Sequence, residues 1–265
     1  MEGAALRSFL RAFHERYPGV TAASMEALAD ESGENSYRLL AEIALEDKRN
    51  ARVLDAGCGD GVLLAEIRRM SAVAHLSGID LVPSEVSLAK ARVPDATIVS
   101  GDITQPLPFP DSAFDVVTAH LVMMLLGPID ATLQQIARVL RANGRFAFIV
   151  DDFVSDAEIF THLVNVAIRA TPASVSDLSA RFSADARIYD STVLKALLHK
   201  HGFDGFRERR IILRSEVDAA SAWNLVSGTY PVGVLEESQL ELARIAVGAE
   251  IAALGSATVR FPLKV

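Results

Sequence analysis

A short apolar strand that runs directly into three glycines at alternate positions constrains this chain more than any other feature. Residues 53–61 read Val-Leu-Asp-Ala-Gly-Cys-Gly-Asp-Gly, and an amphipathic stretch follows over 62–70. Gly57, Gly59 and Gly61 carry no Cβ, so the turn can take positive φ angles and approach a bound molecule closely. The segment therefore predicts a strand–loop–helix unit whose backbone contacts a ligand.

The spacing of these glycines discriminates between classes of cofactor. Dinucleotide-binding loops have a third small residue one position further along, where helix packs against strand. Here that position is Val62, and Gly61 comes one residue early. The loop thus fits a nucleoside cofactor better than a pyrophosphate-containing one, and an NAD-dependent oxidoreductase is the less favoured alternative.

Acidic residues follow the next two predicted strands. Residues 74–81 read as an apolar strand that brings Asp80 to the position where doubly wound nucleotide folds place the acid for the ribose hydroxyls. A third strand, 96–100, leads into Gly101-Asp102-Ile103. A carboxylate suits such sites because it accepts two charge-assisted hydrogen bonds. As alternatives, Asp80 is a helix cap or turn residue and Asp102 a turn residue.

Two further strands extend the pattern. Residues 114–120 form a fourth strand after Leu107-Pro108-Phe109-Pro110-Asp111, and 146–150 form a fifth. The helix predicted between them, over 129–141, ends near Asn143-Gly144, a pair that can take the left-handed conformation.

These motifs, in this order, resemble the class I S-adenosylmethionine (SAM)-dependent methyltransferases over residues 36–151. The glycine loop is similar to motif I of that family, and the segments before and within the fourth strand resemble its small-molecule branch, the methyltransferase 11 group with the ubiquinone and menaquinone enzymes. The family's Leu-x-Pro-Gly-Gly turn has Ala142 and Asn143 at its third and fourth positions here, which keeps the turn chemistry. The resemblance implies a Rossmann-like α/β fold: a seven-stranded sheet with helices on both faces, an antiparallel last strand and helical cap elements.

The resemblance also implies a SAM site, with S-adenosylhomocysteine as product. Asp80 would accept the ribose hydroxyls, Asp102 the adenine amino group, and Ile103 would pack on the adenine ring. Cys58, the only cysteine, is expected to pack beside the cofactor rather than to act as a catalytic thiol. The cofactor-binding residues expected are Tyr37, Asp55, Ala56, Gly57, Cys58, Gly59, Gly61, Asp80, Leu81, Gly101, Asp102, Ile103, Ala119 and His120.

The catalytic residues are less well defined. Methyl transfer from a sulfonium needs in-line alignment, and a base only for acceptors that are protonated at the working pH. His120, just past the fourth strand, is a candidate base because imidazole titrates near neutrality. Asp151 and Asp152 follow the fifth strand, at the edge where α/β sheets bind ligands. Alternatively, His120 contributes only its backbone to the cofactor site, and the aspartates cap a helix.

Four other residues are candidates for lid or substrate contacts. His14 and Tyr17 lie in a leading helical segment of the kind that folds over SAM in related enzymes, although simple packing on the sheet explains them equally well. Met124 would lie near the pocket floor or in a packing seam. Trp223, the only tryptophan, would roof an apolar substrate pocket or pack in the core.

Composition and charge narrow the class of protein. With 265 residues, 50% of them hydrophobic, the chain can bury a full core as one domain with embellishments. The net charge is −8 and the densest basic cluster, 207–210, contains a glutamate, which argues against nucleic-acid partners. A single cysteine permits no intrachain disulfide or cysteine-cluster metal site, and no other spacing suggests a metal. No segment is expected to span a membrane or act as a signal peptide, so a cytoplasmic protein is expected.

The expected organisation has four parts. A helical lid, 1–50, precedes the SAM-binding core, 51–151; a helical insertion that caps the substrate, 152–190, precedes the end of the sheet, 191–265, which itself carries a helical insertion at about 215–255. Within these parts we expect a helix over 191–200, strands over 205–214 and 257–264, and helices over 215–227 and 236–254.

Together these features predict a SAM-dependent methyltransferase that transfers a methyl group in line to O, C or N of a small, largely apolar metabolite of natural-product or quinone-like type. A protein that uses the same fold for a non-methylating role, as a cyclase or a binding scaffold, has an identical cofactor motif and remains the main alternative. The acceptor and the oligomeric state are left open.

Overall fold

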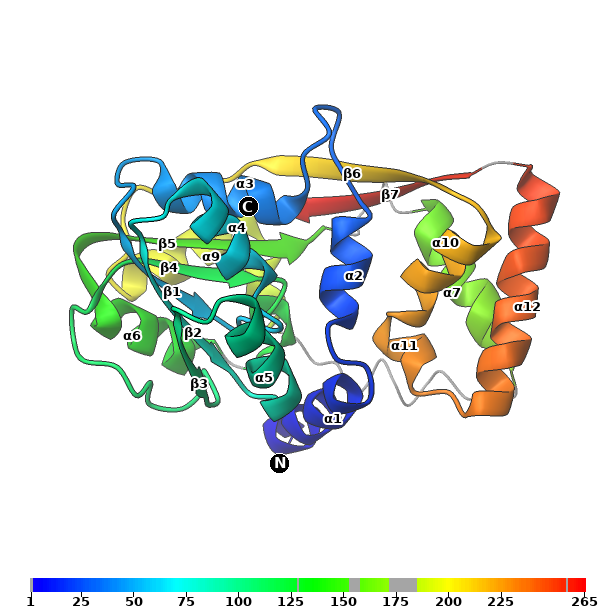
Figure 1. Cartoon of the computed structure of the whole chain (residues 1–265), viewed down its shortest axis with the longest axis horizontal. Helices are drawn as coiled ribbons and strands as arrows, with labels where there is room; N and C mark the ends of the chain where they lie inside the picture. Colours follow the sequence, from blue (N-terminus) through cyan, green and yellow to red (C-terminus); the bar gives the residue numbers. More distant parts are fainter. Residues whose placement is uncertain (1, 128, 153–157, 172–184, 256) are drawn as a thin grey trace.

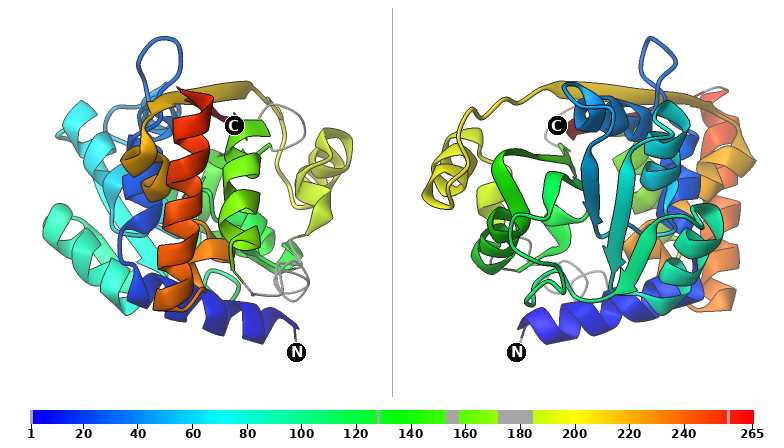
Figure 2. Two further views of the ribbon diagram at one scale, coloured as in Figure 1. Left: turned by 90° about the vertical axis from the view of Figure 1, so that its right-hand side faces the viewer. Right: turned by 60° about the vertical axis from the view of Figure 1, so that its left-hand side comes forward.

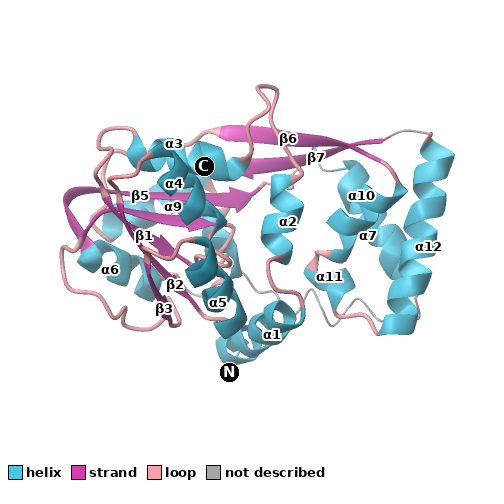
Figure 3. Ribbon diagram, in the orientation of Figure 1, coloured by secondary structure: helices cyan, strands magenta, loops and turns pink. Residues whose placement is uncertain are grey.

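A seven-stranded sheet with the strand order β3-β2-β1-β4-β5-β7-β6 organises the molecule (Figures 1 and 3). The computed structural model describes residues 2–127, 129–152, 158–171, 185–255 and 257–265. The first five strands are parallel, whereas β7 is antiparallel to both of its neighbours. This arrangement confirms the expected fold class. The strands are β1 (Arg52–Ala56), β2 (His75–Asp80), β3 (Thr97–Ser100), β4 (Phe114–His120), β5 (Leu140–Asp151), β6 (Arg210–Val217) and β7 (Ala257–Lys264).

Helices cover both faces of the sheet because its strands are apolar on both sides. Successive side chains of a strand point to opposite faces, so that Val53 belongs to one hydrophobic core and Leu54 to the other. The first core includes α3 (Ser36–Leu45), α4 (Val62–Met70) and α5 (Pro83–Arg92), and the second includes α6 (Asp130–Val139) and α9 (Ser191–Lys200).

The remaining helices gather beyond the carboxyl ends of the strands. Those inserted between β6 and β7 pack with α7, and α2 stands between this helical group and the sheet (Figures 1 and 2). The helix α1 lies against α5, across the same end of the sheet. These elements are α1 (Glu2–Arg16), α2 (Val20–Glu26), the 3₁₀ turns η1 (Met123–Leu125) and η2 (Ala186–Ile188), α7 (Glu158–Arg169), α10 (Ala219–Ser227), α11 (Tyr230–Gly233) and α12 (Glu237–Leu254).

Most predicted elements are present, and the main differences concern β5 and β6. Strand β5 begins at Leu140 rather than at residue 146, so that α6 ends at Val139 rather than at residue 141. Strand β6 was expected over 205–214 but runs from Arg210 to Val217, because its register follows β7 along its whole length. The basic cluster therefore largely precedes the strand, and α10 begins at Ala219 rather than at residue 215. Part of the expected insertion 152–190 lies outside the described residues. In the described part of that insertion the structure has α7 and η2.

The hairpin β6–β7 is displaced toward the carboxyl end of the sheet. Strand β7 pairs with β6 from Ala257 to Lys264, but its registered pairs with β5 are only those of Val150 and Asp151. Within the described residues, no other strand pairs with the first half of β5 on this side. No helix in the described part of the chain is long and apolar enough to span a membrane.

Candidate active site

The glycine loop adopts the conformation that its sequence predicts. Gly57, Gly59 and Gly61 have φ angles of 78°, 51° and 84°. A Cβ on Gly61 would come within 2.9 Å of the Cα of Ala89, so this glycine allows α4 and α5 to pack closely. A Cβ on Gly59 would meet no atom within 4 Å, so the loop is open on this side. That open space is where a ligand can contact the backbone.

Two cavities of about 110 and 100 Å³ lie where β1, β2, β3 and β4 end. The first is bounded by α1, by residues 81–82 and by residues 101–104; the second extends toward α2, α3 and α11. The residues that line both are His14, Gly57, Asp80, Val122 and Leu125.

Most of the expected cofactor residues line one of these cavities. They are Tyr37, Asp55, Gly57, Cys58, Gly59, Asp80, Leu81, Gly101, Asp102, Ile103 and His120. Ala56, Gly61 and Ala119 do not, because they are buried in β1, at the start of α4 and in β4. Burial also raises the pKa of the Cys58 thiol, whose sulfur packs against Gly78, as expected for a packing residue rather than a nucleophile.

Asp80 holds the glycine loop to the end of β2. Its carboxylate accepts the Gly59 amide at 2.8 Å and the Val82 amide at 2.9 Å. Burial raises its pKa. Because an ionised carboxylate has about four acceptor positions, Asp80 can accept further hydrogen bonds from a ligand.

Buried carboxyl groups concentrate around the second cavity. Asp55 accepts a 2.9 Å hydrogen bond from Thr118, yet burial raises its pKa to about 7. Burial likewise raises the pKa of Asp60 to about 6, although Arg92 lies 2.6 Å away. Glu85 is also buried, and its Oε2 has no hydrogen-bond partner among the described residues. Such a concentration of acids suits a ligand that carries positive charge.

His120 forms a wall of the second cavity in a neutral state. Its Nε2 lies 2.9 Å from the Ser36 hydroxyl, and its ring stacks on Tyr37 with a centroid distance of 4.0 Å. Burial lowers its pKa to about 3. The structure therefore gives His120 a poor environment for the expected role of general base, because its imidazole binds a proton only weakly. Its buried Nδ1, which has no partner in the described part of the chain, remains available for a hydrogen bond.

The helix α1 contributes polar contacts that close the cavities. Arg7 Nε lies 3.1 Å from the second oxygen of Asp102, whose first oxygen accepts the backbone and hydroxyl of Thr104. His14 lies between Glu85 Oε1, 3.4 Å from its Nδ1, and the Tyr230 hydroxyl, 3.2 Å from its Nε2. No sequence pattern pointed to Glu85 or Tyr230, since Tyr230 is 216 residues from His14.

The other candidates lie away from the cavities. Asp152 is buried against Arg210 at 2.6 Å and Lys264 at 3.6 Å, so it ties β5 to β6 and β7. Asp151 accepts the Tyr189 hydroxyl at 3.0 Å. The expectation that these aspartates orient an acceptor is not supported, because neither lines the two cavities.

Of the lid and substrate candidates, one lines the cavities and the other three do not. His14 lines both cavities, but Tyr17 lines neither and packs against Phe13. Met124 and Trp223 pack against the hydrophobic core, in agreement with the alternative that the sequence left open for each.

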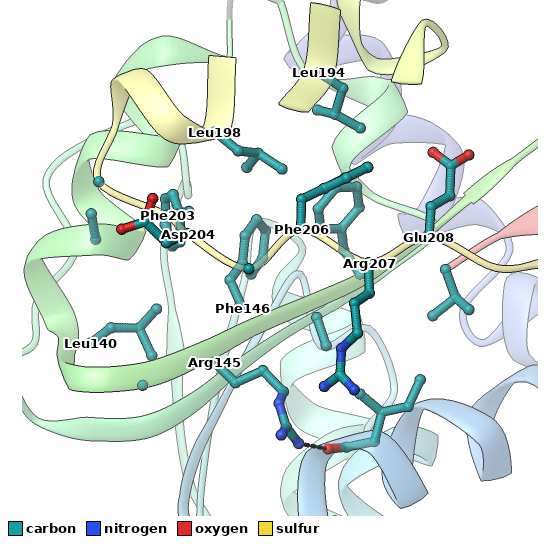
Figure 4. Close-up of a pocket in the computed structure, with 18 of the residues that line it drawn as sticks. Leu140, Arg145, Phe146, Leu194, Leu198, Phe203, Asp204, Phe206, Arg207 and Glu208 are labelled. Carbon is teal, nitrogen blue, oxygen red and sulfur yellow. Dashed lines mark hydrogen bonds between the residues drawn. The ribbon is translucent and has the colours of Figure 1, made fainter. Parts of the chain in front are cut away.

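A larger hollow of about 920 Å³ borders the first half of β5 (Figure 4). Phe146 projects from β5 toward the segment that carries Phe203 and Phe206, below Leu194 and Leu198 of α9. No residue expected at the active site lines this hollow.

Comparison with known proteins supports the identification of the core. A family model described as a methyltransferase domain matches residues 54–148. The chain is 33% identical to the fatty-acid O-methyltransferase of Mycolicibacterium smegmatis over 45% of its own length and 44% of the relative. It is 35% identical to the demethylmenaquinone methyltransferase of Beutenbergia cavernae, over 38% of its own length and 41% of the relative. The alignments thus span less than half of either curated relative.

A solved structure resembles the fold over nearly the whole chain. A putative sarcosine dimethylglycine methyltransferase from Galdieria sulphuraria superposes with a TM-score of 0.57 at 14% identity, and the match covers 96% of this chain and 98% of that one. Taken with the strand order, these similarities show that the chain has the class I methyltransferase fold and that residues 54–148 form a methyltransferase domain of the SAM-dependent type.

Proposed function

We propose that this protein transfers the methyl group of SAM to a small, largely apolar acceptor. The observation that carries the proposal is that two cavities share Gly57 and Asp80 at the carboxyl ends of the parallel strands. Ligands of open α/β sheets bind at this edge. One cavity has the acid expected for adenine, Asp102, and the other has buried acids suited to the cationic methionyl portion.

The residues around the cavities fit such a cofactor. Asp102 would accept the adenine amino group, Asp80 the ribose hydroxyls, and Asp55 would attract the ammonium group. When bound, SAM supplies a methyl group that is already activated by the sulfonium. Asp80 and the loop from Gly57 to Gly59 would hold the donor, and the unpartnered His120 Nδ1 offers one more hydrogen bond.

The closed position of α1 implies that entry of the cofactor requires movement. Each cavity is smaller than the roughly 300 Å³ at which ligand pockets begin. Leu6, Arg7 and Leu10 of α1 close the first cavity. We therefore propose that α1 is a lid, which shifts outward to admit SAM and then excludes water.

Aromatic rings packed behind Tyr230, which lines the second cavity, support an apolar acceptor. The Phe13 ring lies 4.7 Å from that of Tyr230 and 6.2 Å from that of Phe9, measured between centroids. Fatty acids and demethylmenaquinone, the substrates in the names of the two curated relatives, are also largely apolar. Whether O, C or N accepts the methyl group depends on the acceptor. In-line alignment of the donor with the acceptor atom promotes transfer to each of the three.

Binding and turnover test the proposal separately. SAM and S-adenosylhomocysteine should raise the melting temperature, whereas NAD should not, because a ligand stabilises a native state that binds it. Incubation of SAM with a panel of quinols, phenols and fatty acids should then yield S-adenosylhomocysteine and a methylated product. No shift at saturating SAM would refute the proposal. A shift without methylation of any acceptor would favour the non-methylating alternative.

A further inference from the structure

Three side chains from distant parts of the sequence form a contiguous triad at the cavities, through one hydrogen bond and one close ion-pair contact. His14 of α1 lies between Glu85 of α5 and Tyr230 of α11. Glu85 Oε1 is itself held by the Gly19 amide at 2.9 Å, and the Glu85 carboxylate is buried. This order of carboxylate, imidazole and hydroxyl resembles the arrangement that orients a histidine as a base in other enzymes.

The position of His14 relative to the donor follows from the two cavities. This step rests on the proposed function. The sulfonium joins the adenosyl part of SAM to its methionyl part, so a donor that occupies both cavities has its sulfonium where they meet. Of the five residues that line both, only His14 and Asp80 have side chains that can bind a proton. Asp80 is engaged with the Gly59 and Val82 amides.

We infer that Glu85, His14 and Tyr230 form a triad that accepts the proton from the hydroxyl group of the methyl acceptor. As the acceptor oxygen forms its bond to the methyl carbon, the carbon–sulfur bond breaks and its electron pair stays on sulfur. The acceptor proton passes to the Tyr230 oxygen while the Tyr230 proton passes to Nε2 of His14. The resulting imidazolium is stabilised by the Glu85 carboxylate beside Nδ1. This triad takes the role of general base that the sequence had suggested for His120.

The tautomer of His14 tests the direction of proton transfer through the triad. In the triad, Nδ1–H faces the Glu85 carboxylate 3.4 Å away, and Nε2 keeps the lone pair that accepts from Tyr230. Nitrogen NMR of histidine-labelled protein near neutral pH, assigned by the signal lost in His14→Gln, should show an unprotonated Nε2 and a protonated Nδ1. A protonated Nε2, in a neutral or a doubly protonated ring, would overturn the inference.

The relative affinity for SAM and S-adenosylhomocysteine tests whether His14 lies beside the sulfonium. The two ligands differ by one positive charge, which a protonated His14 would repel. Between mildly alkaline and mildly acidic pH, the wild-type preference for SAM should fall about tenfold more than that of His14→Gln, given the strength of charge interactions in partly buried sites. Tyr230→Phe, which keeps the imidazole, should retain the wild-type pH dependence.

The other titratable groups that face this site are unchanged in His14→Gln. They are Arg7, Tyr37, Asp55, Cys58, Asp60, Asp80, Glu85, Asp102, His120 and Tyr230. His75→Gln, which replaces an exposed histidine at the start of β2, should behave as wild type and serves as the control. Equal pH dependence in wild type and His14→Gln would refute the placement of His14 while SAM still binds. Failure of both ligands to bind the wild type would instead refute the proposed function.

Discussion

The hollows at the two ends of the sheet differ in size and in chemistry. The hollow beside the first half of β5 has a volume of about 920 Å³, whereas the cavities at the carboxyl ends have volumes of about 110 and 100 Å³. The large one exists because β7 pairs with β5 only near Val150 and Asp151. The size of the large hollow thus follows from the register of β7 against β5.

Side chains of the large hollow include stacked aromatic rings and paired charges. Phe146 and Phe148 stack at 4.8 Å, and Arg145 of the rim lies 3.1 Å from Glu46. The small cavities instead have buried acids with raised pKa values and polar atoms without partners in the described part of the chain. Buried groups of this kind cost stability, so they mark a functional site better than volume does.

The stability of the ligand-free protein should reveal the cost of burying Asp55. Its pKa of about 7 in the folded state exceeds the value near 4 of an unfolded chain. Between these values the folded state binds more protons, so the free energy of unfolding should decrease as pH rises from about 4 to about 7. Asp55→Asn should be more stable than wild type at the higher pH by about 2–4 kcal/mol, as measured by urea unfolding.

The matched control for this measurement is Asp204→Asn, at the exposed rim of the large hollow. It should show the wild-type dependence on pH. If Asp55→Asn also keeps the full wild-type slope, the carboxyl group is ionised in the folded protein and the contrast between the two regions loses its main support.

The affinity for SAM should depend strongly on Asp80. In Asp80→Asn one acceptor oxygen is replaced by a donor amide, so the ribose hydroxyls lose a charge-assisted partner. Loss of such bonds costs about 1.5–3 kcal/mol, which is about 10- to 150-fold in affinity. Isothermal titration calorimetry measures this loss, again with Asp204→Asn as control. An affinity within twofold of wild type would show that the carboxylate only holds the glycine loop.

The lid proposal predicts a local change in hydrogen exchange. Amides of α1 should exchange at least about tenfold more slowly with SAM bound, because lids belong to the less stable parts of a structure. Amides of α9, which borders the large hollow, should not change. Equal exchange of α1 in the free and bound protein would identify it as a permanently docked helix.

A smaller effect is expected from replacement of His120. General-base catalysis contributes about 10²–10⁴-fold, but a group with a pKa of about 3 is a weak base near neutrality. His120→Gln, which can still bond to Ser36, should therefore lower turnover less than tenfold. A loss of a hundredfold or more with unchanged SAM affinity would restore His120 as the base.

The smallest effect should come from the large hollow. Phe146→Ala removes a ring from its floor and should leave the affinity for SAM unchanged within error, even if the melting temperature falls. A selective loss of SAM affinity in this variant would mean that the two regions are coupled, which would contradict the comparison.

Much of the fold follows from local sequence patterns. The strand–loop–helix unit around Gly57, Gly59 and Gly61 depends on backbone conformations available to consecutive residues, and α4 has the predicted bounds. The acids Asp80 and Asp102 reach the cavities because parallel strands bring their carboxyl ends to one edge. Such features could be predicted because spacing along the chain determines them.

The strand register and the polar contacts of the cavities were decided by tertiary structure alone. The length of β6 depends on its pairing with β7, and residues 215–217 therefore form strand rather than helix. The expected base His120 became a buried, neutral group because Ser36 and Tyr37 pack on it. Glu85, His14 and Tyr230 meet only after three separate helices have docked. Residue types and spacing determine which groups a chain offers, whereas burial and long-range packing determine which of them share a site and which proton each one holds.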